Sequence, residues 1–163
     1  MLIRSGIVTS DKIDHKVRGD RGVTALHYAC LNGDKETTKL LLAFGAEPRS
    51  FSDNGTPAIM YATFDSNQNN LDTFETVIKW VSQHVRHNML SVPDQHGWTA
   101  LHTLCSTGAM GHLKWNGRGS MLPKTLGKVR INAVTSNGLS VMHVAAWNLS
   151  LETLRLLLQA HRL

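Results

Sequence analysis

Apolar residues recur at helical spacing in short runs that glycines and polar turns separate. In the clearest run, Leu26 and Ala29 share one helix face after Thr24, and residues 35–44 carry three consecutive leucines. Thr24 suits the N-cap of the first predicted helix, and Gly33 suits the turn between the two helices. Two helices this short cannot bury their apolar faces alone, so the pattern predicts that neighbouring pairs stack on one another.

The same pattern predicts further helices along the chain. Those with an apolar stripe are residues 57–64, 71–85, 141–147 and the leucine-rich segment from Leu151. The polar segment 65–70 is predicted to be part of an insertion. Residues 108–127 contain five glycines and a proline, which oppose one long helix, so we expect a loop there with a short helix near 121–126.

Comparison of the chain with itself reveals one motif in four copies. Residues 22–30 read GVTALHYAC and residues 97–105 read GWTALHTLC, with weaker copies at 55–62 and 138–146. The aligned apolar residues are separated by 33, 42 and 41 positions, and they are Leu26, Ile59, Leu101 and Met142. One spacing is a bare repeat, and the other two carry insertions.

At these residues the chain resembles the ankyrin-repeat family, whose unit is a β-turn and two helices with a T-P-L-H-x-A pattern over about 33 residues. The first copy matches at Thr24, Leu26, His27 and Ala29, and departs at Ala25, where the family prefers proline. The resemblance covers residues 19–108 and 131–163. It implies an all-α solenoid of helix-turn-helix units with short β-turn or hairpin connections.

We expect one domain of about four repeats plus a partial one at the N-terminus. The predicted boundaries are 1–18 for the partial repeat, 19–51, 52–93, 94–134 with a Gly-rich basic insertion, and 135–163 for a truncated fourth repeat. Both ends fall within a repeat, and solenoids normally need polar caps. This predicts part of a longer array or self-association through uncapped ends, with a frayed true terminus as the alternative.

Charge changes this picture at one place only. Charged residues are 18% of the chain and the net charge is +5. Most of the excess lies in one segment, with Lys114, Arg118, Lys124, Lys128 and Arg130. These residues form either a solvated loop or an anion-binding surface. No apolar run or leader pattern suits a membrane span or secretion, so we expect an intracellular protein, cytoplasmic or nuclear.

Histidine and cysteine are the residues most suited to chemistry here. Cys30 and Cys105 hold equivalent positions two repeats apart, so they are expected to be buried thiols of a reducing compartment. His102 and Cys105 share a helix face but lack two further ligands, so no metal site is expected. The resemblance implies that His27, His102 and His143 bond neighbouring turns. No catalytic constellation or cofactor motif occurs, and we expect no enzyme activity.

The resemblance also implies a concave binding surface built from turn tips and the solvent side of the inner helices. Carried over by position, it consists of Arg21, Val23, Leu31, Asn32, Asn54, Thr56, Phe64, Asp65, His96, Trp98, Leu139, Trp147 and Asn148. Phe64, Trp98, Leu139 and Trp147 are expected to stand exposed along one groove. The alternative is that the insertions cover these four side chains as ordinary core.

The function predicted from the sequence is a non-catalytic scaffold that binds a segment of another protein in this groove. Trp98 and Trp147 are the expected anchors, because aromatic side chains dominate protein interfaces. The alternative is a polyanion-binding or nucleic-acid-binding module that uses the basic segment 114–130, whose affinity would fall steeply with salt.

Overall fold

The computed structural model describes residues 13–17, 21–84, 89–109 and 132–160, and the side chains of all of these except 159 and 160. In three places within the described residues an inner helix is followed by an outer helix, as the resemblance implies. In order, the helices are α2 (Ala25–Leu31), α3 (Lys35–Ala43), α4 (Ala58–Tyr61), α5 (Gln68–His84), the 3-10 helix η2 (Met89–Ser91), α6 (Ala100–Ser106), α9 (Val141–Trp147) and α10 (Leu151–Ala160). No extended strand occurs among these residues, so the expected all-α ankyrin solenoid is confirmed.

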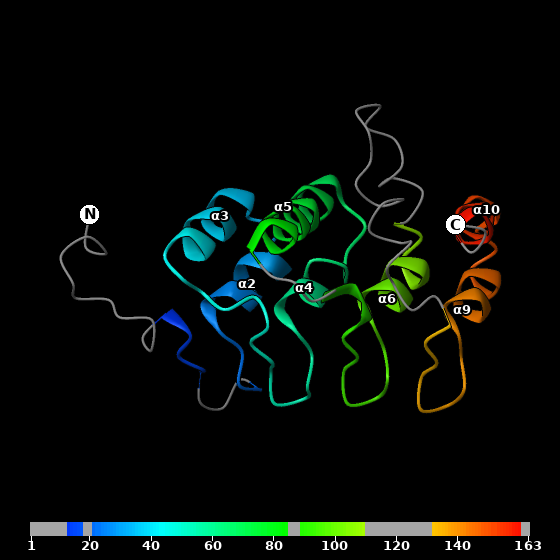
Figure 1. Cartoon of the computed structure of the whole chain (residues 1–163), viewed down its shortest axis with the longest axis horizontal. Coiled ribbons are helices and arrows are strands. Elements are labelled where there is room, and N and C mark those ends of the chain that lie inside the picture. The colour runs from blue at the N-terminus through cyan, green and yellow to red at the C-terminus, as the bar shows by residue number, and fades with distance from the viewer. Residues whose placement is uncertain (1–12, 18–20, 85–88, 110–131, 161–163) are drawn as a thin grey trace.

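The inner helices α2, α4, α6 and α9 follow one another along the long axis of the molecule (Figure 1). The outer helices α3, α5 and α10 lie in a second row on one side of them, and the turn loops project to the other side. We call α2 and α3 repeat one, α4 and α5 repeat two, α6 repeat three, and α9 and α10 repeat four. One buried apolar core runs through the stack, including Leu26, Ile59 and Leu101 at the aligned motif positions.

Three inner helices begin with the same local arrangement. Thr24, Thr99 and Ser140 are their N-caps, and the histidine three residues later turns its ring back toward the capping residue. The outer helix α3 begins differently, because the Asp34 carboxylate accepts the backbone N–H of Thr37 at 3.0 Å. The caps therefore fix where each helix starts, since they satisfy backbone groups that the first turn leaves unpaired.

Neighbouring turns are joined by backbone hydrogen bonds. The Asp53 N–H donates to the Arg21 carbonyl at 2.7 Å, and the Ser136 N–H donates to the His96 carbonyl at 2.9 Å. Gly97 permits this close approach, because a Cβ there would lie 2.9 Å from the Thr135 Cα. Its φ of +77° also belongs to the left-handed region that favours glycine. The turn glycines thus set the spacing at which repeats stack.

The predicted helices agree with the structure except near residue 65. The predicted segments 35–44, 57–64 and 71–85 contain or overlap α3, α4 and α5, and segment 141–147 coincides with α9. The predicted start of the second helix of repeat two at Leu71 is wrong, because α5 already begins at Gln68, inside the polar segment 65–70. The Asn67 side chain accepts the backbone N–H of Asn70 at 2.9 Å, which supports this early start. The loop predicted for 108–127, with its short helix at 121–126, lies outside the described residues apart from 108 and 109.

Candidate functional site

Two buried histidines connect successive repeats. His27 accepts the Thr24 backbone N–H on Nδ1 at 3.1 Å, which assigns its proton to Nε2, and Nε2 donates to the Thr56 carbonyl at 3.2 Å. His102 makes the equivalent bond to the Leu139 carbonyl at 3.2 Å. Burial lowers the pKa of both rings from the ordinary value of 6.5, and the carbonyl bonds oppose that shift. The expected bonding between turns is therefore confirmed for these two residues.

The other two repeats lack this connection. Repeat two has the buried Met60 where the other repeats have histidine. A hydroxyl contact of 2.6 Å between Thr63 and Thr103 joins the turn after its helix α4 to α6 instead. His143 of repeat four is exposed, and within the described residues its ring bonds only to Ser140 of its own unit. The stack is thus held by different contacts at its successive interfaces.

The structure separates the thirteen residues predicted to contact a partner into three groups. Val23 and Thr56 are buried, and Asn54 and Trp98 are half-buried. The remaining nine are exposed, namely Arg21, Leu31, Asn32, Phe64, Asp65, His96, Leu139, Trp147 and Asn148. Most of the predicted surface is therefore open to solvent, although its partner-binding role stays a prediction.

The expectation that Trp98 stands exposed is wrong. Its indole packs against the core, with its ring centre 5.8 Å from that of His102. Val23, at the equivalent turn position of repeat one, also lies beside the histidine of its own unit. Side chains at this position therefore cover the buried histidine, whereas Leu139 in repeat four remains 40% exposed.

Two asparagine side chains have structural contacts that the sequence did not reveal. The Asn148 amide donates to the carbonyls of Cys105 and Ser106 at 3.0 and 2.9 Å, at the end of α6. The Asn70 amide donates to the carbonyls of Cys30 and Leu31 at 3.2 and 2.9 Å, at the end of α2. Each amide binds carbonyls that the helix end leaves without an intrahelical partner, and so joins one repeat to the preceding one.

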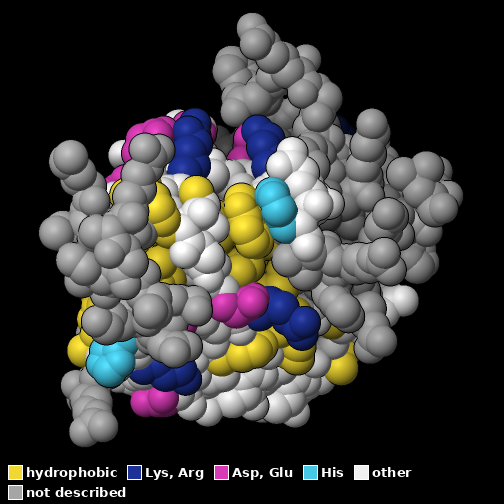
Figure 2. Space-filling view, turned by 60° about the vertical axis from the view of Figure 1, so that its left-hand side comes forward, with side chains coloured by type: hydrophobic (Ala, Val, Ile, Leu, Met, Phe, Trp, Pro, Cys, Tyr) yellow, Lys and Arg dark blue, Asp and Glu magenta, His cyan; other side chains and the backbone are white. Residues whose placement is uncertain are grey.

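A surface hollow of about 230 Å³ lies between the inner helices of repeats one and two. We call it the repeat-one hollow; it is lined by Arg21, Val23, His27, Tyr28, Leu31 and Tyr61. Tyr28 and Tyr61 were not predicted as site residues, although they hold equivalent positions in the repeat motif. Viewed with the side on which the chain begins turned forward (Figure 2), hydrophobic side chains are exposed above and below a group of acidic and basic side chains near the centre.

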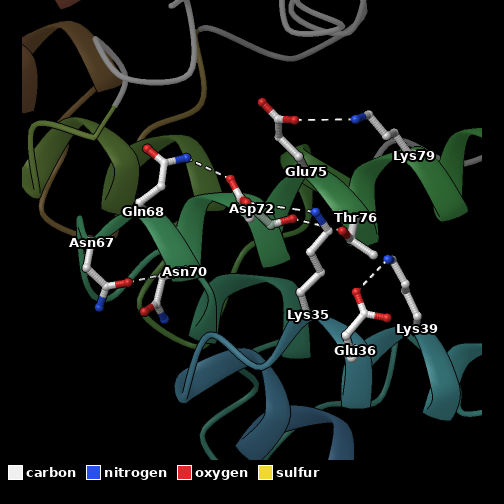
Figure 3. A network of polar contacts seen from close by, with 10 residues as sticks. All are labelled: Lys35, Glu36, Lys39, Asn67, Gln68, Asn70, Asp72, Glu75, Thr76 and Lys79. Atoms are coloured by element: carbon white, nitrogen blue, oxygen red, sulfur yellow. Dashed lines mark hydrogen bonds and ion pairs between the residues drawn. The ribbon is translucent and has the colours of Figure 1, made fainter. Parts of the chain in front are cut away.

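The outer helices carry a polar network instead. Lys35 of α3 lies 3.8 Å from the Asp72 carboxylate of α5, and the Gln68 amide donates to the same carboxylate at 2.7 Å (Figure 3). Lys79 and Glu75 form a further pair along α5 at 3.4 Å. These exposed pairs contribute little stability each, because solvent screens them. They give the outer face a charged character that the inner-helix face does not share.

At repeat four, no described residue covers the side that would face a further repeat. Leu158 occupies the position of Leu42 in repeat one, yet it is 53% exposed where Leu42 is 1% exposed. Trp147 occupies the position of Leu31, and its exposed fraction is 88% against 40%. The difference follows from stacking, because α5 packs against α3 and the described residues supply no such neighbour for α10.

Sites for other chemistry are limited within the described residues. No group of three His, Cys, Asp or Glu side chains is placed there to hold a metal ion. Cys30 and Cys105 are free and buried, and burial raises the pKa of both thiols to about 12. None of the helices in this part of the chain is long and apolar enough to span a membrane. The predicted anion-binding residues Lys114, Arg118, Lys124, Lys128 and Arg130 lie outside the described residues.

Comparison with known proteins agrees with this architecture. Residues 2–84 match the family described as ankyrin repeats (3 copies), which is half of the chain. The chain is also 29% identical over 111 residues to a protein named tyrosine-protein kinase HTK16 from Hydra vulgaris. That similarity covers 67% of this chain and only 14% of the kinase. The matched family, the repeated turn-and-helix units and the histidine bonds between turns agree, and the chain belongs to the ankyrin-repeat family.

Proposed function

We propose that this array is a non-catalytic scaffold whose concave face binds a segment of another protein. Ankyrin repeats are generally modules of protein interaction. The observation that carries the proposal is the contrast between the two faces. Exposed large apolar side chains, among them Leu31, Phe64, Leu139 and Trp147, follow the turns and inner helices. Lys, Glu and Asp pairs lie on α3 and α5, where Leu40 is the one large apolar side chain exposed among the described residues, and α10 exposes Leu151 and Leu158. Exposed apolar side chains gathered on one face are typical of interaction surfaces.

The proposed anchors are Phe64 and Trp147. Trp147 is 88% exposed, and the Phe64 ring lies 5.1 Å from the Tyr61 ring in a tilted arrangement. Aromatic side chains are large, and they release much ordered water when a partner covers them. Trp98, the other anchor expected from the sequence, is replaced by Phe64 because its indole already packs on the core.

The resemblance to a kinase adds no catalytic role to the proposal. The chain matches only 14% of that protein, and the described part of the chain has the architecture of an interaction module. We propose that the similarity reflects a shared ankyrin-repeat region. Self-association through the side of repeat four that no described residue covers is a secondary proposal, which the exposure of Leu158 supports.

The test is a comparison of matched apolar truncations. A partner would first be selected from a displayed peptide library, and its affinity then measured by calorimetry for Phe64→Ala, Trp147→Ala and Leu40→Ala. Leu40 is the control because it is an exposed leucine of the outer helix α3. We expect each groove variant to weaken binding about thirtyfold and the control to change it less than about twofold. Unchanged affinity in both groove variants, with their helix content intact, would refute the proposal.

A further inference from the structure

We infer that the repeat-one hollow receives a large apolar side chain of the partner whose neighbour in sequence is acidic. The inference rests on the proposed function and specifies the chemistry of the segment that binds. It is drawn from three properties of the hollow, which are its size, the state of its polar groups and the charge at its edge.

The size of the hollow suits one side chain. Its volume is about 230 Å³, and a cavity of about 150 Å³ is enough to bind benzene. Tyr28 and Leu31 of α2 are 37% and 40% exposed, and Tyr61 of α4 is half-buried. A phenyl ring or a branched aliphatic side chain would therefore gain apolar contacts from both inner helices.

The histidine in the hollow does not present a polar group to a ligand. His27 is fully buried, and its Nε2 already donates to the Thr56 carbonyl. Its Nδ1 accepts from the Thr24 backbone and lies 2.8 Å from the Thr24 hydroxyl. Both ring nitrogens are thus occupied, so His27 offers a ligand no free hydrogen-bonding group. The apolar parts of Tyr28, Leu31 and Tyr61 favour an apolar side chain.

A basic side chain stands at the edge of the hollow. Arg21 is exposed, and among the described residues its guanidinium forms no ion pair. The neighbouring acid Asp53 lies 4.0 Å from Lys16 instead. Arg21 is therefore a basic side chain at this edge with no carboxylate partner among the described residues. A guanidinium binds a carboxylate through two parallel hydrogen bonds, so an acidic residue is the complementary neighbour.

Repeat three does not reproduce the walls of the hollow. Tyr28 and Leu31 correspond in repeat three to Thr103 and Ser106, which are smaller and polar. The equivalent surface of repeat three thus lacks the apolar walls. An acidic segment with one large apolar side chain is consequently expected to bind at repeat one, with its flanking residues free to continue along the groove.

The test uses three capped hexapeptides that differ at the two central positions: Ac-GSEFSG-NH₂, Ac-GSKFSG-NH₂ and Ac-GSEASG-NH₂. Each is titrated to millimolar concentration into the isotope-labelled full chain, and the backbone amide shifts of Arg21, Tyr28 and Leu31 are followed. We expect the Glu-Phe peptide to move these amides and the other two to bind about tenfold more weakly. Equal binding of the Glu-Phe and Lys-Phe peptides would overturn the acidic specificity. No movement of these amides with any peptide would overturn the site.

Charge reversal sharpens the result. Arg21→Glu should exchange the preference, so that the Lys-Phe peptide binds better than the Glu-Phe peptide, which would also show that the variant is folded. Lys79→Glu is the matched control, because it makes the same charge change on the outer helix α5 and should leave the preference as it is. An Arg21→Glu variant that keeps the original preference would overturn the assignment to Arg21. If the peptides do not bind as expected but partner binding still depends on Phe64 and Trp147, the inference about the hollow is refuted and the proposed groove is not.

Discussion

The histidine contact between repeats one and two yields a quantitative prediction through His27→Met. Methionine is suitable because Met60 is buried at the equivalent position of repeat two. The substitution removes the bond of 3.2 Å to the Thr56 carbonyl and leaves the Thr24 N–H without its acceptor. The Thr56 carbonyl keeps its bond from the Ser52 N–H. One lost bond and one unsatisfied buried donor together predict a destabilisation of about 2–3 kcal/mol.

The destabilisation caused by His27→Met is expected to depend on pH. Burial lowers the pKa of His27 in the folded protein below 6.5, its ordinary value. Below about pH 6.5 the unfolded chain therefore binds a proton that the folded protein does not, and the stability of the unmodified protein falls as the pH falls. The variant lacks this group. The difference in the free energy of unfolding between the two proteins should have its full value above about pH 7. It should become smaller below pH 6.5, by at most about 1.4 kcal/mol per pH unit.

Urea unfolding followed by circular dichroism at about pH 7.5 and pH 5.5 measures both effects. His143→Met is the matched control, because His143 holds the same motif position but is exposed and, among the described residues, bonds only to its own N-cap. We expect His143→Met to lower the free energy of unfolding by less than half as much as His27→Met does, since it removes no bond between repeats. Equal losses in the two variants, or a His27→Met difference that does not change with pH, would refute the reasoning.

Three further predictions concern the stack itself. Burial raises the pKa of the Cys30 and Cys105 thiols to about 12, so a thiol reagent at neutral pH should modify neither cysteine until urea unfolds the protein; rapid labelling of the native protein would contradict their burial. Gly97→Ala places a Cβ 2.9 Å from the next turn and should cost about 2 kcal/mol in thermal unfolding, more than Gly45→Ala, where nothing lies within 4 Å. Asn70→Ala removes two hydrogen bonds to the end of α2 and should cost about 2 kcal/mol; a change below about 0.5 kcal/mol would show that water replaces them.

The sequence predicted the helices best where periodicity and capping residues agree. Helix α9 coincides with the predicted segment 141–147, because Ser140 caps its start and Asn148 follows its end. The start of α5 was missed because it depends on side-chain bonds. The Asn67 amide donates to the Asp65 carboxylate at 2.7 Å, and the Asn67 oxygen accepts from the backbone of Asn70. A polar run of this composition is typical of a loop until those bonds are known.

Burial at the turns could not be predicted from position alone. Val23, Trp98 and Leu139 hold one motif position, yet they are buried, half-buried and exposed respectively. What differs is the surroundings, since Trp98 packs against the core beside His102, whereas the histidine of repeat four is itself exposed. An alignment of repeats transfers the backbone position of a residue, but the covering of its side chain depends on the side chains around it.

Asn70 and Asn148 also have contacts that an alignment of the repeats does not predict. Both amides donate to the last carbonyls of the preceding inner helix, yet Asn70 is the third residue of the outer helix α5 and Asn148 is the C-cap of the inner helix α9. No alignment of repeats by position would pair them. The requirement they share is physical, because the end of a short helix leaves carbonyls that need donors, and the nearest side chain that can reach them supplies the bond. Different interfaces of the stack therefore meet the same need with residues from different elements, and substitution of either asparagine should weaken its own interface without altering the other.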